Sequence, residues 1–265
     1  GDVYKRQDQG GNEPFEIENV KGDLNFKDID FSYVKGEQVL KHFDLWVKSG
    51  QKIAIVGATG SGKTTVVNLL TRFYDIDGGV ITLDGQDIRN IPVNKLRGSI
   101  GIVLQDTVIF SDTIAQNIRY GRIDATDEEI VEAAKIARVD DFASKLSDGY
   151  NTMLTEGGSN LSQGQRQLIS IARAVLADPK ILILDEATSS IDTRTEMHIQ
   201  EAMVALMKGR TSLIIAHRLS TIRDADKIVV ISGGKVVEAG DHDELLAQKG
   251  EYYKLYQSQF AGIAT

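Results

Sequence analysis

The sequence of 265 residues contains no cysteine, no long apolar run and no excess of basic side chains. The lack of cysteine excludes disulfides and thiolate metal sites, and it fits a reducing compartment. The longest apolar run is Ala202–Met207, whereas a membrane-spanning helix needs about 20 apolar residues. We therefore expect no membrane-spanning helix, and no signal peptide is visible. The net charge of −8 argues against broad nucleic-acid binding, which usually shows as a basic domain.

The rest of the composition, 42% hydrophobic and 26% charged, is typical of a soluble globular protein with one large domain or two small ones. Gly1–Gln7 resembles a translated adapter, and the residues that follow it up to position 14 are polar and aperiodic. We expect residues 1–14 to be a linker or non-native segment, and residues 15–262 to form the folded domain.

Two kinds of hydrophobic pattern divide the chain. Apolar and polar residues alternate from Phe15 to Lys48, which predicts antiparallel strands with one face in water. The apolar run Ile53–Val56, a glycine-rich turn and the helical spacing over Lys63–Tyr74 are typical of the start of a parallel α/β unit. Helical patterns dominate from about residue 110 to 177, including a capping box at Thr126–Glu129, and predict an inserted helical subdomain. Further strands are predicted at Val80–Leu83, Ile100–Leu104, Ile181–Leu184, Ser212–Ala216 and Lys227–Ile231, and further helices at Asp112–Tyr120, Asp140–Leu146, Asp241–Gln248 and Glu251–Phe260.

A phosphate-binding loop follows the first predicted parallel strand. Gly57-Ala-Thr-Gly-Ser-Gly62-Lys63-Thr64 matches the pattern G-x-x-x-x-G-K-[ST], in which glycines let several main-chain N–H groups face one point. Lys63 can reach the β and γ phosphates, and Thr64 can supply a hydroxyl to Mg²⁺. A plain glycine-rich turn is the alternative, but strand, loop and helix all fall where the motif requires them. The predicted nucleotide-binding residues of this loop are Gly57, Ala58, Thr59, Gly60, Ser61, Gly62, Lys63, Thr64 and Thr65.

Two adjacent carboxylates, Asp185 and Glu186, follow the buried run Ile181–Leu184. Ligands of open parallel sheets bind at the carboxyl ends of the strands, so Asp185 is suited to hold Mg²⁺ directly or through water. Glu186 is one residue further and could polarise an attacking water molecule. The alternative is a solvent-exposed, charged strand end without a catalytic role.

These motifs and several others, in the same order, resemble the nucleotide-binding domain of an ATP-binding cassette (ABC) transporter from about Phe15 to Gly262. The further matches are Tyr33 of Phe-Ser-Tyr, Gln105 of Val-Leu-Gln-Asp, the signature Leu161-Ser-Gln-Gly-Gln165, the D-loop Ser190-Ile-Asp192, and His217. Each has an ordinary structural alternative when taken alone, and the joint arrangement decides between them. The resemblance implies an α/β fold: a P-loop NTPase (RecA-like) core with an N-terminal antiparallel β-subdomain and an inserted α-helical subdomain.

The resemblance also implies ATP and Mg²⁺ as cofactors, and a role for each matched residue. Tyr33 resembles the aromatic that stacks on adenine, and Gln105 resembles the Q-loop glutamine that contacts Mg²⁺ and water. The implied magnesium ligands are Thr64, Gln105 and Asp185. The implied catalytic residues are Glu186, His217, Gln105 and Lys63. The remaining histidines, His42, His198 and His242, match no family role and are interpreted as structural or exposed.

The signature indicates a protein that works in pairs. Ser162 stands where a helix N-cap would, so the following helix forms a second anion-binding start on the same chain. In the family, two cassettes pack head to tail, and ATP lies between the P-loop of one and the signature of the other. The residues implied to complete the partner's site are Ser162, Gln163, Gly164, Gln165 and Asp192.

Three segments are similar to exporter cassettes: 103–114, 155–158 and 240–246. In exporters the cassette follows a transmembrane domain on the same polypeptide, and Glu156 matches a segment thought to touch its coupling helices. The resemblance therefore implies export through transmembrane domains absent from this chain, at the cytoplasmic face of the cell membrane, by a fragment that is itself soluble. The transported substrate is not encoded in this sequence.

The signature departs from the family pattern at Gln163, where most members have glycine. Glycine is used where φ must be positive or where the backbone approaches a ligand. The departure resembles heterodimeric exporters with one degenerate ATP site, so we expect a different subunit with an intact signature as partner. A tolerated variant in a homodimer is the alternative.

Three other functions remain as alternatives to an exporter. An importer cassette differs in whether a membrane domain is fused upstream. A cassette acting on DNA or the ribosome usually carries coiled-coil or zinc insertions or a second cassette, and this chain has neither. A regulatory module that binds ATP without hydrolysis is disfavoured by Glu186.

Overall fold

The computed structural model describes residues 14–58, 60–186 and 191–259. The chain divides into two compact units. The first contains the residues up to Ile100 together with those from Arg210 onward, and the second contains Gly101–Gly209. The boundaries predicted for the cassette at 15–262 and for the helical subdomain at about 110–177 stay predictions.

The first unit begins with an antiparallel sheet of strand order β2-β1-β4-β5. Its strands are β1 (Leu24–Val34), β2 (Glu37–Val47), β4 (Gly78–Leu83) and β5 (Gln86–Asp87). The alternation of polar and apolar residues places Leu24, Phe26, Ile29 and Phe31 of β1 in the core. The pairing of β1 with β2 shifts register between Phe26 and Ile29, which keeps both residues buried on either side of the irregularity. The expected antiparallel strands are confirmed, although residues 17–19 form a 3₁₀ turn, η1 (Ile17–Asn19).

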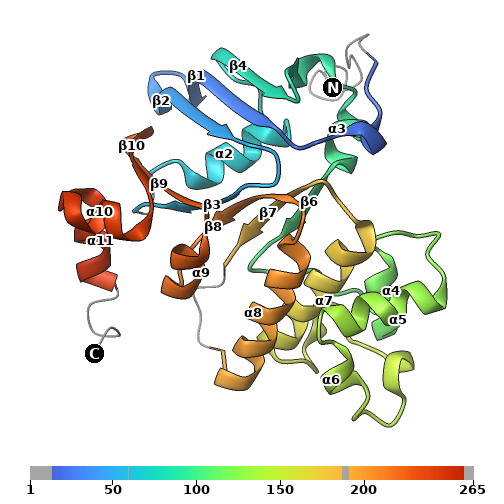
Figure 1. The fold of residues 1–265 in the computed structure, drawn as a ribbon. Coiled ribbons are helices and arrows are strands. Elements are labelled where there is room, and N and C mark those ends of the chain that lie inside the picture. The colour runs from blue at the N-terminus through green and yellow to red at the C-terminus, as the bar shows by residue number, and fades with distance from the viewer. Residues whose placement is uncertain (1–13, 59, 187–190, 260–265) are drawn as a thin grey trace. The chain divides into compact units, whose positions relative to one another are not determined.

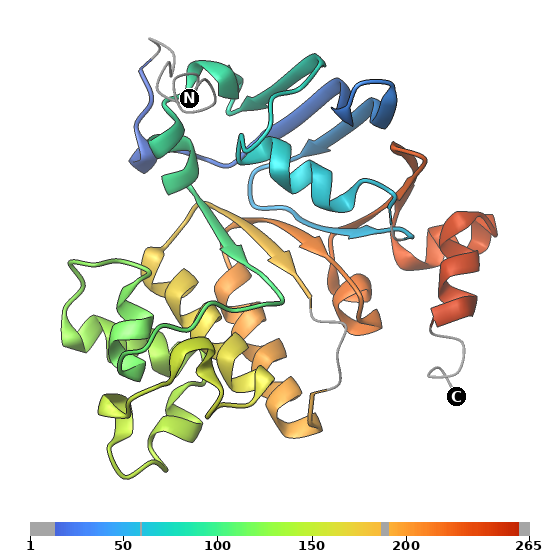
Figure 2. The same ribbon diagram turned by 180° about the vertical axis from the view of Figure 1, so that it is seen from behind.

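The same unit contains a second set of strands in the order β10-β9-β3-β8. They are β3 (Lys52–Val56), β8 (Thr211–Ile215), β9 (Lys227–Ser232) and β10 (Lys235–Gly240). Strand β3 pairs in parallel with β8 and with β9, and all three are apolar almost throughout because both faces are covered. Strand β10 was missed by the sequence analysis, since its residues are half-buried or exposed and give little apolar signal. Both views show helix α2 between the antiparallel sheet and β3 (Figures 1 and 2).

The helices of the first unit are short. They are α2 (Lys63–Leu70), η2 (Ile88–Asn90), α3 (Val93–Gly98), α9 (Leu219–Asp224), α10 (His242–Gln248) and α11 (Glu251–Gln259). Helix α2 ends four residues before the predicted limit at Tyr74, and Arg72 just beyond it adopts a left-handed φ of 57°. The N-terminus of α11 is capped by a residue from β10. The carboxylate of Glu238 accepts hydrogen bonds from the main-chain N–H groups of Glu251 and Tyr252.

The second unit is mainly helical, with strands β6 (Ile100–Val103) and β7 (Ile181–Asp185). Its helices are α4 (Ile114–Arg119), α5 (Asp127–Ile136), α6 (Asp140–Ala143), η3 (Gly149–Asn151), η4 (Glu156–Gly158), α7 (Gln163–Ala177) and α8 (Thr193–Met207). The buried stripe of α7 includes Leu168, Ile171 and Ala172, and it packs against α4, α5 and α8 (Figure 1). The capping box predicted at Thr126–Glu129 is present. Helix α6 ends at Ala143, three residues before the predicted limit.

Within the described ranges, no helix is long and apolar enough to cross a bilayer. This agrees with the short apolar runs of the sequence.

Candidate nucleotide-binding site

The loop between β3 and α2 has no room for side chains at its first and last glycines. A Cβ on Gly57 would lie 2.5 Å from the main-chain oxygen of Ile231. Gly62 has a φ of +110°, and a Cβ there would lie 2.8 Å from Leu40 Cδ2. The predicted loop residue Thr59 lies outside the described residues. The sequence motif therefore corresponds to a local geometry that only glycine fits at these two positions.

The N-terminus of α2 faces the phosphate loop. Gly62 is the N-cap of α2 and has no side chain that could cap the helix. Among the described residues, the buried hydroxyl of Ser61 has no hydrogen-bond partner. The Lys63 ammonium spans the loop and donates to the Gly57 carbonyl at 2.6 Å. The start of a helix without a side-chain cap, the Ser61 hydroxyl and the Lys63 ammonium form a donor set that fits a phosphate group.

His217 is placed beside this loop by strand register. Strands β3 and β8 pair in parallel with Ile55 opposite Ile215. Gly57 and His217 each lie two residues beyond these partners, so both follow the carboxyl ends of adjacent strands at the same level. In open α/β sheets this is the edge at which ligands bind. The first unit thus brings together two of the predicted site elements, the phosphate loop and His217.

Tyr33 lies near the end of β1 and is held at its hydroxyl. The Tyr33 oxygen accepts a hydrogen bond from Asn68 Nδ2 at 2.9 Å and lies 3.0 Å from Thr65 Oγ1. Its ring makes edge-type contacts with Phe31 and Tyr74, at centroid distances of 4.7 and 4.8 Å. The side chain of the predicted residue Thr65 is therefore engaged with Tyr33. Asn68 and Tyr74 were missed by the sequence analysis; the aromatic pair at positions 73–74 after the phosphate loop was the available signal.

The predicted magnesium ligands fall in different units. Gln105 and Asp185, both in the second unit, are brought together, because Gln105 Nε2 donates to Asp185 Oδ1 at 3.1 Å. Thr64 belongs to the first unit. Glu186 follows Asp185 and is 2% exposed. Among the described residues, no cluster of three or more His, Cys, Asp or Glu side chains could hold a metal by itself. This oxygen-donor pair still fits Mg²⁺, which commonly takes one or two carboxylates and completes its shell with phosphates and water.

The signature forms the N-terminus of α7, as predicted. Ser162 Oγ accepts the main-chain N–H of Gln165 at 3.1 Å, and Gln165 Oε1 accepts the N–H of Ser162 at 3.0 Å, which completes a capping box. A Cβ on Gly164 would lie 2.4 Å from Thr195 Cγ2, so glycine is needed for the start of α8 to pack here. Ser162 is exposed, and its hydroxyl proton remains available as a donor.

The D-loop residue Asp192 lies against the same region. It is the N-cap of α8, and its carboxylate accepts the N–H of Thr195 at 3.0 Å. That hydrogen bond holds the pKa of Asp192 below its usual range. Its neighbour Ile191 approaches Gly164, while Ser190 lies outside the described residues. The signature and the end of the D-loop therefore belong to one packed surface.

The backbone at Gln163 does not require glycine. Gln163 is the first residue of α7 and has helical dihedrals, and it is not among the positive-φ residues of the described chain. Of the two uses of glycine considered for this position, a positive φ does not apply, and the approach of the backbone to a ligand stays a prediction. The side chain of Gln163, half-buried at the helix start, is what distinguishes it from glycine.

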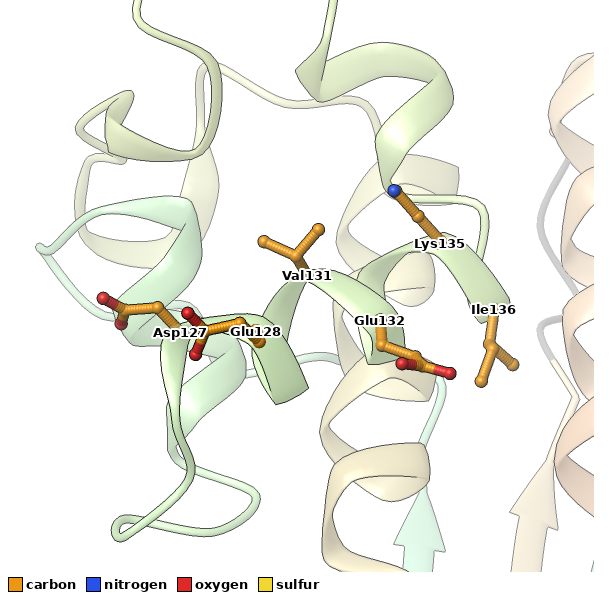
Figure 3. A pocket seen from close by; sticks show the side chains of 6 residues that line it. All are labelled: Asp127, Glu128, Val131, Glu132, Lys135 and Ile136. Carbon is orange, nitrogen blue, oxygen red and sulfur yellow. The ribbon is translucent and has the colours of Figure 1, made fainter.

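Two hollows in the second unit lie outside the predicted site residues. One, of about 620 Å³, runs along α5, and its lining side chains all come from that single helix, including Glu128, Val131 and Lys135 (Figure 3). The other, of about 260 Å³, is a more apolar groove lined by residues that follow β6 and by the last turns of α7. Leu104 and Val108 line this groove, and they are 50% and 63% exposed.

Comparisons with known proteins agree with these elements. The sequence profile of the ABC transporter family matches residues 40–189. The chain is 58% identical to the uncharacterized ABC transporter ATP-binding protein YfiC of Bacillus subtilis, over 90% of this chain and 40% of YfiC. It is 51% identical to an ATP-dependent lipid A-core flippase of Syntrophus aciditrophicus, over 94% of this chain and 41% of the flippase.

A solved structure with a similar fold is that of a bacterial Atm1-family ABC exporter with ATP bound. The TM-score is 0.86 at 41% identity, over 96% of this chain and 45% of the exporter chain. The chain thus spans less than half the length of the relatives that it matches. It has the P-loop NTPase fold of their ATP-binding part, and it belongs to the ABC transporter family.

Proposed function

We propose that this chain binds ATP with Mg²⁺ and hydrolyses it in a head-to-tail pair of cassettes, and that this powers export of a substrate through a transmembrane domain. The observation that carries the proposal is the phosphate loop, where glycine is sterically required at both ends, α2 starts without a side-chain cap, and His217 follows the adjacent parallel strand.

In this reaction Tyr33 stacks on the adenine, and the loop residues Gly57 to Thr65 surround the phosphates. Lys63 and His217 stabilise charge that develops on the γ-phosphate. Glu186 accepts a proton from the attacking water, whose oxygen forms a bond to phosphorus as the bond to the ADP oxygen breaks. Thr64, Gln105 and Asp185 are the proposed holders of Mg²⁺. Bound Mg²⁺ supplies positive charge next to the phosphate oxygens.

The capped start of α7 supports a role for the signature in a partner's site. Ser162 is exposed and keeps its hydroxyl proton, while its oxygen lone pair caps the helix. An exposed helix N-terminus with a donor hydroxyl can cover the phosphates of a second cassette. Asp192 caps α8, whose first turn packs against Gly164 of the signature, and it belongs to the same proposed interface.

We further infer that the partner is a different subunit with an intact LSGGQ signature. Support comes from the side chain of Gln163, which adds a long polar group at the half-buried start of α7 where glycine would add nothing. In that arrangement the phosphate loop of this chain forms the hydrolysing site, and its own signature completes the weaker one. A homodimer with a tolerated glutamine is the alternative.

The apolar groove beside β6 supports a membrane-domain partner. Exposed Leu104 and Val108 lie within a few residues of Gln105, so a segment docked there would contact the Q-loop directly. The flippase and exporter relatives favour export over import. On this proposal the chain works at the cytoplasmic face of a membrane, as part of a longer transporter.

The test of ATP hydrolysis is Glu186→Gln, with the exposed Glu128→Gln on α5 as matched control. We expect Glu186→Gln to bind ATP, to sediment as a more stable dimer with ATP, and to release phosphate at least a hundredfold more slowly. Glu128→Gln should match the unsubstituted chain in all three measurements. Normal phosphate release by Glu186→Gln would show that the assigned base is wrong.

The test of the partner is the phosphate release rate of this chain alone and mixed with a cassette that carries LSGGQ. The heterodimer proposal expects slow turnover alone and fast turnover in the mixture. Full turnover by the lone chain at micromolar concentration would instead support the homodimer.

A further inference from the structure

The predicted adenine-stacking residue, Tyr33, is contacted by two residues that no ATP-binding motif contains, Asn68 at its hydroxyl and Tyr74 at its ring. It is 43% exposed, so much of its ring is accessible to a ligand. A side chain this exposed at the end of a strand ordinarily samples several rotamers. Here the contacts at its hydroxyl and at its ring restrict that freedom.

The hydroxyl contacts join Tyr33 to the helix that begins at the phosphate loop. Asn68 donates to the phenol oxygen, which leaves the phenol proton free to be donated to Thr65 Oγ1. Thr65 is 4% exposed and lies two residues after Lys63. Thr65 and Asn68 are three residues apart, so they share one face of α2, and both reach the same oxygen.

The ring contacts come from one buried and one exposed aromatic residue. Phe31, two residues earlier on β1, is 3% exposed and meets the Tyr33 ring at 87°. Tyr74 is 49% exposed and meets it at the same angle from the segment after α2. A tyrosine that is half exposed buries little apolar surface for the core. Its ring contacts are with Tyr33, at a centroid distance of 4.8 Å, and with Phe31, at 5.9 Å, so Tyr74 packs against the aromatic pair to which Tyr33 belongs.

We propose that Asn68 and Tyr74 are positioning residues for nucleotide binding, which hold the Tyr33 ring in the orientation that accepts the base. This inference rests on the proposed function, because it assumes that Tyr33 stacks on the base of ATP. An ordered ring loses less conformational entropy when the base stacks on it, so the two residues increase affinity without touching the nucleotide. Helix α2 follows directly on the phosphate loop and contains Thr65 and Asn68, which contact Tyr33. One helix therefore links the position of the adenine base to that of the phosphates.

The test compares Mg²⁺-ATP with Mg²⁺-tripolyphosphate, which lacks the base, by isothermal titration calorimetry on the 265-residue chain. We expect Tyr74→Ala to weaken ATP binding roughly 2- to 12-fold, which is the range of an aromatic pair contact. Tripolyphosphate binding should stay within about twofold, since the phosphate loop is unchanged. Tyr74→Phe retains the ring and should restore ATP affinity. Asn68→Ala should weaken ATP binding in the same selective way.

The control is Tyr120→Ala, which removes a tyrosine of similar exposure, 52%, from the second unit. It should leave both affinities unchanged. In steady-state assays, Tyr74→Ala should raise KM for ATP and keep kcat, because the ring orientation serves bound ATP and transition state alike.

Three results have distinct meanings. ATP affinity of Tyr74→Ala equal to that of the unsubstituted chain would overturn the positioning role. Equal loss of ATP and tripolyphosphate binding would also overturn it, since Tyr74 would then act on the fold of the loop. Failure of the unsubstituted chain to bind ATP, with tripolyphosphate still bound, would instead contradict the proposed function.

Discussion

The guanidinium of Arg173 on α7 donates from Nε to the main-chain oxygen of Asn117 at 2.7 Å, although the two residues are 56 positions apart. Its Nη2 also donates to Asn117 Oδ1 at 3.0 Å, and Nη1 donates to the carbonyl of Val108 at 2.6 Å. Asn117 is fully buried, and its amide binds the main chain of Phe110 and Thr113. The pair therefore fixes the segment that follows the Q-loop to the helix that follows the signature.

Arg173→Lys should destabilise the chain by roughly 2–3 kcal/mol, because a lysine cannot reproduce three directed hydrogen bonds and removes the side-chain donor to the main-chain oxygen of the buried Asn117. The urea midpoint measures this. Arg194→Lys, at an exposed position on α8, is the control and should change the free energy of unfolding by less than about 0.5 kcal/mol. Equal stability of the two variants would mean that the Arg173 bonds contribute little.

Gly57→Ala should abolish measurable ATP binding or weaken it at least tenfold. The added Cβ would lie 2.5 Å from a main-chain oxygen, which cannot move without shifting β9. Gly78→Ala is the matched control, because a Cβ there meets its nearest neighbour at an ordinary 3.4 Å. Calorimetric ATP titration of both variants checks the prediction, and retained affinity in Gly57→Ala would contradict the steric argument.

Two substitutions at Ser162 separate its helix-capping role from its proposed role toward a partner's phosphates. Ser162→Ala removes the cap and should cost about 1 kcal/mol of stability. Ser162→Asp keeps an acceptor for the Gln165 N–H and should retain stability, yet it places a negative charge at the proposed phosphate position. We expect the aspartate variant to be stable and at least tenfold slower in ATP hydrolysis. Normal hydrolysis by the aspartate variant would count against a signature role for Ser162.

His242 should make stability depend on pH. Its Nδ1 lies 2.6 Å from the Tyr252 hydroxyl, and its Nε2 accepts from Arg223 Nε at 3.3 Å, which requires a neutral ring. Burial, and then the charge of Arg223, hold the pKa of His242 below its ordinary value of 6.5. The unfolded chain therefore takes up a proton first as pH falls. The contribution of His242 to the free energy of unfolding is complete above about pH 6.5. It is lost as the pH falls through the pKa of His242 in the folded chain.

The measurement is the urea midpoint of the unsubstituted chain and of His242→Gln between pH 8 and pH 5. The difference between the two should shrink as the solution is acidified. His42 gives the opposite sign, because its hydrogen bond to Asp28 raises the pKa of the imidazole. Its contribution is complete below about pH 6.5 and is lost as pH rises through the folded pKa, so His42→Gln should produce the reverse trend. A difference that grows on acidification for His242→Gln would contradict the assignment of His242, and one that shrinks for His42→Gln would contradict that of His42.

The sequence predicted the elements whose signals are local. The phosphate loop, the capping box at Thr126, the N-cap at Ser162 and the apolar run of β7 all depend on neighbouring residues and appear in the structure. Strand β10 was missed because its hydrophobic pattern is weak. It forms a strand through its antiparallel pairing with β9, which the sequence does not reveal. At Gln163 the sequence left two uses of glycine open, a positive φ and a close approach to a ligand, and the helical backbone removes the first.

The long-range contacts could not be read from the sequence. Neither the Arg173–Asn117 pair nor the contacts of Tyr33 with Asn68 and Tyr74 follow from spacing, because each depends on how separate elements pack. The motifs identified Tyr33, and only the structure identified Asn68 and Tyr74 as residues that contact it.

The parallel pairing of β3 with β8 also determines which insertions the site can tolerate. The separation of Gly57 and His217 depends on two adjacent strands that lie about 4.8 Å apart, and not on the length of any loop. Residues added before β8, around Gly209, would leave this separation unchanged. A single residue added inside Thr211–Ile215 would move His217 along the strand and turn buried side chains toward the opposite face. Among related sequences, we therefore expect insertions and deletions in the loops that connect these strands and none within the strands themselves.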